Sequence, residues 1–549
     1  MNPELKAGTV SRCTYSWISP LLFEGAKRPL TTQHLYPLSP ANRAEEIYNV
    51  FEDAWEAIKK IDGKARVQSS PIVLILRASV ISFGSGFAKA AVFLLFQNLV
   101  IVAGPLLLLY LLRWIENYQS EVQPDLHVSL VFPYMLAVGL FCIQILTTFL
   151  TNWNYEMSQL TGFRLRTALT MALYKKSLRL STAARNMYST GFILNCSVSD
   201  TNRIDLACQF FHGLWGSPLL ILITTGLLFW ILGPSCLVGL ALMVAYAPLQ
   251  NYWNLLLTKY RRSANFFTDE RVRTIQEAVS GIRILKIYSW EASFKSIINE
   301  IRTKELHFIL RYLVVRASIS AVTQVIPTFA MIATFACYAL LGNPLSASII
   351  LSSLSLFYTL RIPLLILPQA INQALDALVA FERISNLLLA SEINDNLPIL
   401  DGSNENAIEI FNATFSWGTE IKTIGNQQVK PGVLIDINLV LPKGKLVAII
   451  GPVGSGKSSL FSAIIGEMER LKGEVIVRGT LSYCQQSAWI QNATIRDNIL
   501  FGLPFESEKY EKTIHLSALA SDLNQFLDGD RTEIGERGIN LSGYISMIF

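Results

Sequence analysis

The stretch KLVAIIGPVGSGKSSLFSAIIGEM, residues 445–468, contains the most informative pattern in the chain. An apolar run that favours a β-strand leads into a glycine-rich loop, and an apolar run typical of a helix follows it. The loop has the form G-x-x-x-x-G-K-S, with its fixed positions at Gly451, Gly456, Lys457 and Ser458. Because glycines leave backbone N–H groups room to surround phosphate oxygens, this order of strand, loop and helix predicts a nucleotide-binding loop.

The residues of this loop have separate expected roles. Backbone N–H groups along the loop would surround the phosphates of ATP, Lys457 would pair with the β- and γ-phosphates, and Ser458 would bind Mg²⁺. An ordinary glycine turn is the alternative interpretation. The predicted nucleotide-binding residues of the loop are Gly451, Pro452, Val453, Gly454, Ser455, Gly456, Lys457, Ser458 and Ser459.

The chain around this loop is strongly apolar. Hydrophobic residues make up 51% of its 549 residues and charged residues 16%, and the mean hydropathy is +0.38. This balance indicates an integral membrane protein rather than a soluble enzyme. Six stretches reach the roughly 20 residues that a helix needs to cross a bilayer core. We expect membrane spans near 78–112, 127–152, 206–232, 235–257, 317–341 and 344–368.

The connections between these stretches alternate between tight turns and long loops. Only Gly233-Pro234 separates the third stretch from the fourth, whereas 153–205 and 258–316 form long connections. The two long connections contain seven and twelve Lys or Arg residues against three and six acidic residues. Because basic loops stay in the cytosol, we expect a multi-pass protein with both termini in the cytosol. The net charge of +5 then reflects membrane topology, and we expect no nucleic-acid partner.

Composition divides the chain into four expected parts. Residues 1–70 read as a cytosolic N-terminal segment and 71–390 as a helical transmembrane domain with six spans. The polar, turn-rich residues 391–406 read as a linker. Residues 407–549 contain the β-type runs AIEIFNATFSW, VLIDINLVL and KLVAII, which predict strands of a domain built around the glycine loop.

Ordered motifs along nearly the whole chain resemble the first half of an ABC transporter of the C subfamily, the multidrug resistance-associated proteins. These motifs are TYSWISPLLFEGAKRPL, LGPS, IRILKIYSWE, LRIPLLILP, the glycine loop, LSYCQQSAWIQNATIRDNILFG and DGDRTEIGERGINLSG. The resemblance implies a multi-domain membrane protein, in which an all-α, six-helix, exporter-type transmembrane domain precedes an α/β P-loop nucleotide-binding domain. It also implies transport driven by ATP, with Mg²⁺ as its metal.

The resemblance assigns roles to further positions. Trp417 stands where the family places an aromatic residue that stacks on adenine; packing of a strand edge is the alternative. Gln486 matches the glutamine that approaches Mg²⁺ and the attacking water, with Gln485 as the competing candidate. Asn195–Ile204 and Arg283–Glu291 match the loop tips that dock on nucleotide-binding domains.

Two basic residues lie within the expected spans. Arg361 and Lys89 are costly to place in hydrocarbon, so we expect both to face the interior of the helix bundle or water. Arg361 resembles an arginine that the family uses near anionic substrates, whereas a structural ion pair or snorkelling would explain it without a substrate. The resemblance implies a small amphipathic anion as substrate, membrane lipid around the spans and a second ABC half as partner.

The end of the sequence departs from the family pattern. After the motif that ends in Gly543, the residues YISMIF do not continue the family's signature loop. The second glycine and glutamine of that loop, the aspartate that binds Mg²⁺, the catalytic glutamate and the switch histidine are missing, so we expect a nucleotide-binding domain that is incomplete. We assign no catalytic residue, and we expect negligible ATP hydrolysis by the chain alone because hydrolysis needs carboxylates that hold metal and orient water.

Three functions are compatible with these features. The first is the ATP-binding half of an exporter that moves amphipathic organic anions or xenobiotics across the plasma or vacuolar membrane. The second is a truncated fragment that binds nucleotide or regulates partners without transport. The third is a channel or channel regulator, since the same subfamily includes such members.

Overall fold

The computed structural model divides the chain into two compact units, Met1–Ile393 and Asn394–Phe549. It describes residues 3–63, 70–120, 131–393, 405–418, 422–424, 427–429, 433–484, 489–526 and 528–534. Gln485 and Gln486 and the YISMIF ending therefore lie outside the described residues.

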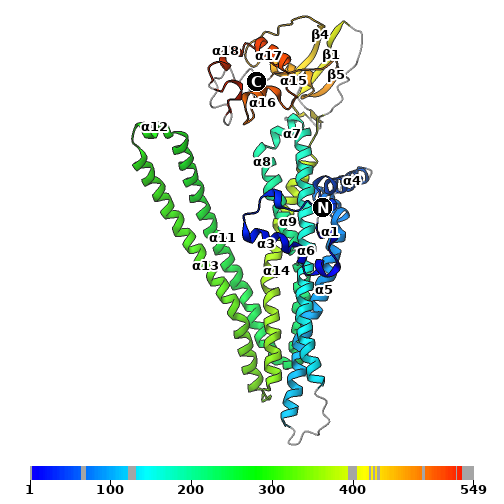
Figure 1. Ribbon diagram of the computed structural model, residues 1–549, viewed down its shortest axis with the longest axis vertical. Coiled ribbons are helices and arrows are strands. Elements are labelled where there is room, and N and C mark those ends of the chain that lie inside the picture. Colours follow the sequence, from blue (N-terminus) through cyan, green and yellow to red (C-terminus); the bar gives the residue numbers. More distant parts are fainter. Residues whose placement is uncertain are drawn as a thin grey trace. The chain divides into compact units, whose positions relative to one another are not determined.

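The regular structure of the first unit is helical, apart from one isolated bridge between Leu180 and Glu392 among its described residues (Figure 1). Its N-terminal helices are α1 (Pro3–Lys6), α2 (Thr9–Cys13), α3 (Ser19–Lys27) and α4 (Ala44–Asp62). Its long helices are α5 (Pro71–Ser120), α6 (Val131–Arg179), α10 (Gly213–Leu232), α11 (Cys236–Ser280), α13 (Glu291–Leu340) and α14 (Ala347–Leu388). Short helices connect them: α7 (Thr182–Met187), α8 (Thr190–Asn195), a π-helical turn at Cys196–Asp200, α9 (Thr201–Phe210) and α12 (Ile282–Ile287).

Among the described residues, five continuous helical runs are long and apolar enough to cross a membrane. They are Pro71–Tyr118, Val131–Arg179, Thr190–Ser280, Glu291–Leu340 and Ala347–Leu388. The sequence predicts six spans because it separates α10 from α11, which here follow one another across the short turn Gly233–Ser235 within the third run. At 1.5 Å per residue, the 50 residues of α5 extend about 75 Å, more than twice the roughly 30 Å of a bilayer core.

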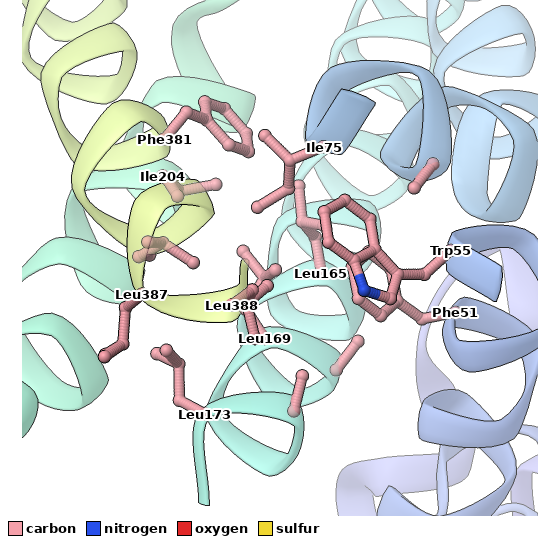
Figure 2. Close-up of a cluster of buried hydrophobic side chains, with 14 of the residues drawn as sticks. Phe51, Trp55, Ile75, Leu165, Leu169, Leu173, Ile204, Phe381, Leu387 and Leu388 are labelled. Atoms are coloured by element: carbon pink, nitrogen blue, oxygen red, sulfur yellow. The ribbon is translucent and has the colours of Figure 1, made fainter. Parts of the chain in front are cut away.

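A large apolar core joins the N-terminal part of the unit to the long helices (Figure 2). Helix α4 presents Ile47, Phe51, Trp55 and Ile58 along one side, at the three- to four-residue spacing that places side chains on one helical face. These side chains are buried against α5, α6, α9 and α14; the partners labelled in Figure 2 are Ile75, Leu165, Leu169, Leu173, Ile204, Phe381, Leu387 and Leu388. The helix within the predicted N-terminal segment 1–70 is thus part of this core.

Helices α11 and α13 pack along each other as a long hairpin that α12 closes (Figure 1). Glu305 on α13 has a side chain that is only 3% exposed, and it accepts hydrogen bonds from Thr268 Oγ1 at 2.7 Å and Arg271 Nε at 2.8 Å. Arg302 Nη1 lies 2.8 Å from the same carboxylate. The buried charge is therefore compensated by two guanidinium groups and a hydroxyl, as a buried carboxylate requires.

The second unit is built on a small antiparallel sheet with strand order β4-β1-β5. Its strands are β1 (Asn406–Ser416), β4 (Leu434–Pro442) and β5 (Glu469–Val477), and a separate hairpin contains β2 (Lys422–Ile424) and β3 (Gln427–Val429). Helix α15 (Lys457–Ile465) covers the sheet, and its side chains Ala463 and Ile464 share a core with Ile410, Phe415 and Val475. The remaining helices are α16 (Ile495–Leu500), α17 (Ser507–Leu516) and α18 (Ala520–Leu523).

One predicted strand is wrong. The run KLVAII at 445–450 has no strand hydrogen bonds among the described residues. The other two predicted runs, AIEIFNATFSW and VLIDINLVL, do form strands, β1 and β4. Leu446 and Ile450 are 101% and 93% exposed. A strand needs a hydrogen-bonded neighbour, and none of the described strands pairs with this run, so its local preference for extended structure is not realised as a sheet.

We predict that Glu305→Gln destabilises the α11–α13 hairpin by about 1–2 kcal/mol, because Arg271 and Arg302 would lose their charged partner but are themselves partly exposed to solvent. The measurement is thermal unfolding of the full chain in lipid nanodiscs. Glu300→Gln is the matched control, since Glu300 pairs with Lys304 on the exposed surface of the same helix. If Glu305→Gln lowers the unfolding temperature and Glu300→Gln does not, the Glu305 carboxylate stabilises the hairpin. Equal effects of the two substitutions would contradict this role.

Candidate functional site

The glycine loop Gly451–Ser459 leads directly into α15, whose first residue is Lys457. Gly454 and Gly456 have φ angles of +83° and +91°, a backbone region that side chains other than glycine's rarely adopt. A Cβ on Gly451 would lie 2.8 Å from Ser455 Oγ, too close for a real contact. The glycines therefore allow the tight loop that the sequence predicts, and the helix start places its free N–H groups beside the loop.

Lys457 folds back across this loop. Its Nζ donates hydrogen bonds of 2.8 Å to the carbonyl oxygens of Gly451 and Pro452. A carbonyl is a neutral acceptor, and a phosphate oxygen would accept a stronger, charge-assisted hydrogen bond from the same ammonium group. The donor set of the loop, an ammonium group and the N-terminus of α15 with two following serines, Ser458 and Ser459, therefore fits a phosphate group.

The residues of the loop are accessible to a ligand. Pro452, Val453, Gly454, Ser455 and Ser458 are exposed, and Val453 is fully so at 104%. On the inner side, Gly456 lies against Leu434, because a Cβ at this glycine would be 3.2 Å from the leucine Cδ2. The loop is thus anchored to β4 on one side and open on the other.

Trp417 follows directly after β1, and its side chain is half-buried. It packs against the core that contains Phe415 and Leu434, and Phe415 pairs with Leu434 across the sheet. Because Leu434 also contacts Gly456, the same residue connects the surroundings of Trp417 with the glycine loop. This placement agrees with strand-edge packing, and Trp417 keeps part of its surface accessible.

None of the other predicted site residues belongs to the described part of the second unit. Gln486 lies outside the described residues. Arg361 is half-buried on α14, whereas Lys89 is exposed on α5. Within the described ranges, no ion pair of either side chain with an acidic residue is found. Both charges thus remain unneutralised by the part of the chain that the structure describes.

The two predicted loop tips differ in exposure. In the second loop, Ile284 and Ile287 on α12 and the following Tyr288 are exposed, as expected for a tip. In the first loop, four of the residues 195–204 are buried, namely Cys196, Asp200, Thr201 and Ile204, and Cys196 and Ile204 belong to the apolar core. The exposed apolar side chains of the first loop are Met187 at the end of α7, Leu194 on α8 and Val198.

A charged cluster in the second unit was not anticipated by the sequence. Asp530 accepts hydrogen bonds from Arg496 Nε at 2.8 Å and from the Tyr510 hydroxyl at 2.9 Å, and Arg496 also lies over the ring of Phe505. Burial and the bond to Asp530 raise the pKa of Tyr510 to about 12. Burial raises the pKa of Asp530, but its hydrogen bonds outweigh this effect and hold the pKa below its ordinary value. The cluster joins α16 and α17 to the turn at Gly529–Arg531.

Comparison with known protein families gives two matches. The family described as ABC transporter transmembrane region matches residues 87–364, and the family described as ABC transporter matches residues 434–543. The second match includes the whole glycine loop. The first lies entirely within the helical unit, and it begins and ends inside α5 and α14.

Similar curated proteins extend along the whole chain. The chain is 35% identical, over 99% of its length, to multidrug resistance protein fer6 of Mycosarcoma maydis, and 33% identical, also over 99%, to ATP-binding cassette sub-family C member 4 of Homo sapiens. A Caenorhabditis elegans relative, multidrug resistance protein mrp-7, is 31% identical over 99% of the chain. The chain spans 43%, 40% and 36% of the length of these three relatives, less than half of each.

The ion cluster of the second unit leads to a pH-dependent prediction. Because the folded-state pKa of Asp530 lies below its ordinary value, its charge stabilises the fold at neutral pH, and this contribution is lost as pH falls through the folded-state pKa. We expect Asp530→Asn to destabilise the α16–α17 region at neutral pH. The effect should be only about 1 kcal/mol, because the side chains of Arg496 and Asp530 are both partly exposed. The difference from wild type should shrink below about pH 4.

Hydrogen exchange of peptides from α16 and α17 in the full chain, corrected for the intrinsic exchange rate, measures this effect. The exposed Glu508→Gln in α17 is the control that removes one negative charge outside the cluster. A difference between Asp530→Asn and wild type that stays constant with falling pH would exclude the carboxylate as its source.

Proposed function

Because this chain belongs to the ABC transporter family, we propose that it is the ATP-binding half of an exporter that moves amphipathic organic anions or xenobiotics across a membrane. The observation that carries the proposal is the glycine loop, in which an ammonium group and a helix N-terminus fit phosphate within a chain that also contains long apolar helices. Two of the similar proteins are named multidrug resistance proteins, which supports the substrate class.

Binding of ATP with Mg²⁺ follows from the chemistry of the loop residues. Lys457 would exchange its two backbone carbonyl partners for phosphate oxygens, and the N–H groups at Gly454, Ser455 and Gly456 would face the phosphates. We propose Ser458 and Gln486 as the residues that hold Mg²⁺, and Trp417 as the side chain beside adenine. Trp417 is half-buried against the core that contains Leu434, and Leu434 contacts Gly456; this position supports the last assignment.

The two loops of the helical unit would connect nucleotide binding to the spans. We propose that the exposed apolar residues of α12 and of the first loop dock on nucleotide-binding domains, one of them supplied by a second ABC half. Apolar side chains that remain exposed outside the spans favour such a protein contact. In this arrangement both termini lie in the cytosol and the helical unit lies in the plasma or vacuolar membrane.

Arg361 and Lys89 are the proposed contacts for an anionic substrate. Helices α5 and α14, which contain these two residues, pack against each other, and neither side chain has an acidic partner among the described residues. An unneutralised cation in a membrane segment is stabilised by an anionic ligand or by water. The half-buried Arg361 is the stronger candidate of the two because its surroundings exclude more water.

We expect Lys457→Ala to weaken ATP binding by about tenfold or more, because a charge-assisted hydrogen bond contributes about 1.5–3 kcal/mol. Binding of a fluorescent ATP analogue to the full chain in nanodiscs, with Mg²⁺ present, measures this loss. Lys445→Ala is the matched control, since Lys445 is an exposed lysine just before the same loop. Wild-type affinity in the Lys457→Ala variant would sink the proposed nucleotide site.

For the substrate, we expect Arg361→Ala to weaken binding of an amphipathic organic anion by about tenfold, the effect of losing roughly 1.4 kcal/mol of charge interaction. Arg361→Lys keeps the charge and should retain most of the affinity. Fluorescence titration of the full chain in nanodiscs with an anionic amphipathic dye is the measurement. If the alanine variant binds the dye as tightly as wild type does, Arg361 has no role in substrate binding.

A further inference from the structure

The residues that leave α14 are attached to the end of α6. The backbone N–H of Ile393 donates to the carbonyl of Arg179 at 2.8 Å, and the N–H of Ser181 donates to the carbonyl of Ser391 at 3.0 Å. Between these two hydrogen bonds, Leu180 and Glu392 form an antiparallel bridge. We call these paired residues, 176–181 and 390–393, the exit strap. The strap ends at Ile393, where the first unit ends.

Side chains reinforce the strap on both sides. Lys176 Nζ donates to the carbonyl oxygen of Ala390 at 2.5 Å and to Glu392 Oε1 at 2.6 Å, and the hydroxyl groups of Ser181 and Ser391 are 2.6 Å apart. The side chain of Lys176 is 7% exposed, whereas that of the adjacent Lys175 is 44% exposed. Burying an ammonium group is costly unless its hydrogen bonds are made, and these two hydrogen bonds of Lys176 both go to the strap.

The strap continues into the first loop of the helical unit. Leu180 is fully buried in the core that also contains Leu387 and Leu388. Ser181 is the N-cap of α7, where its hydroxyl accepts a hydrogen bond from the N–H of Ala184 at 3.2 Å. A displacement of residues 390–393 is therefore transmitted to the end of α6 and to the start of α7 through hydrogen bonds, rather than only along the chain to α14.

A second contact connects the same loop to α14. Asp200 in the π-helical turn is fully buried, and its carboxylate lies 2.9 Å from Arg383 Nη1. The guanidinium group of Arg383 also lies over the ring of Phe192 on α8, 4.8 Å from its centroid. The first loop is thus held by α14 at Arg383 and by the exit strap at Ser391, so both attachments move it with the segment that leads to Asn394.

We propose that the exit strap is a coupling element, in which Lys176 is the positioning residue that transfers movement of the nucleotide-binding unit to α6 and to helices α7 and α8. This inference rests on the proposed function, since it concerns the path by which ATP binding reaches the spans. Without the strap, residues 389–393 would be connected to the helical unit only through the end of α14. Such a single connection transmits less of a displacement than a hydrogen-bonded pair of segments does.

The test is hydrogen exchange, measured by mass spectrometry on the full chain in nanodiscs with and without MgATP. We expect ATP to change the exchange rate of peptides that contain α7 and α8 in wild type. In Lys176→Met, the ATP-induced change in the exchange rate of these peptides should fall about fivefold, which corresponds to a modest coupling between sites. The affinity for ATP should stay at the wild-type value. Glu392→Gln, which removes the partner charge from a 41% exposed side chain, should reduce the response in the same direction.

Two further variants separate coupling from general damage. Lys175→Met removes the neighbouring positive charge, which pairs with Glu52 instead, and it should keep the ATP response. The double substitution Ser181→Cys/Ser391→Cys, added to Lys176→Met, should restore the response when the disulfide is formed and lose it again on reduction. Rescue by a covalent link is not expected if Lys176 only stabilises the fold.

The outcomes separate the inference from the proposed function. If the wild-type chain does not bind ATP, or if Lys457→Ala binds ATP as tightly as wild type does, both the proposed function and the exit-strap inference are overturned. Suppose that Lys176→Met and Glu392→Gln both bind ATP normally, and that ATP changes hydrogen exchange at α7 and α8 in them as much as in wild type. This result would overturn the exit-strap inference alone. If Lys176→Met fails to fold, Glu392→Gln and the disulfide in the wild-type background decide the question.

Discussion

A chain that crosses hydrocarbon must satisfy its own backbone N–H and C=O groups, and this constraint determines the form of the first unit. Long continuous helices meet it, and their hydrogen bonding does not stop where the bilayer stops. The helices α5, α6, α11 and α13 therefore continue beyond the length of any bilayer core. Everything else in this unit depends on these extensions, because outside the hydrocarbon side chains of opposite charge can pair on them.

The extensions are held together by different forces in different places. Where α4, α5, α6 and α14 meet, burial of apolar side chains such as Phe51 and Leu169 is the main stabilising force (Figure 2). Along the α11–α13 hairpin, an ion cluster centred on Glu305 supplies the specific contact. Where the chain leaves α14, the buried ammonium group of Lys176 and two backbone hydrogen bonds connect it to α6. The contacts of Lys176 adjoin the first loop, because Ser181 is the N-cap of α7.

Local patterns predicted much of this architecture. The apolar stretches lie within long helices, the G-x-x-x-x-G-K-S motif forms a tight loop before α15, and two of the three predicted strands are present. The strand at 445–450 was predicted wrongly, because extended structure is stable only beside a hydrogen-bonded neighbour, and a run such as KLVAII does not reveal whether that neighbour exists. The roles of Gln486 and of the substrate-facing residues stay predictions, since they depend on a ligand and on residues beyond those described.

The sequence by itself determined which segments are helical and apolar, where the phosphate loop lies and which family the chain resembles, because these properties depend on residue type and spacing over a few turns. Only the tertiary structure decided that α4 completes the core, that Glu305 is buried between two arginines, and that Lys176 rather than Lys175 anchors the exit strap. The physical reason is that burial and pairing depend on which helix faces meet. Two adjacent lysines look alike in a sequence, but they point to different sides of α6 and so have different partners.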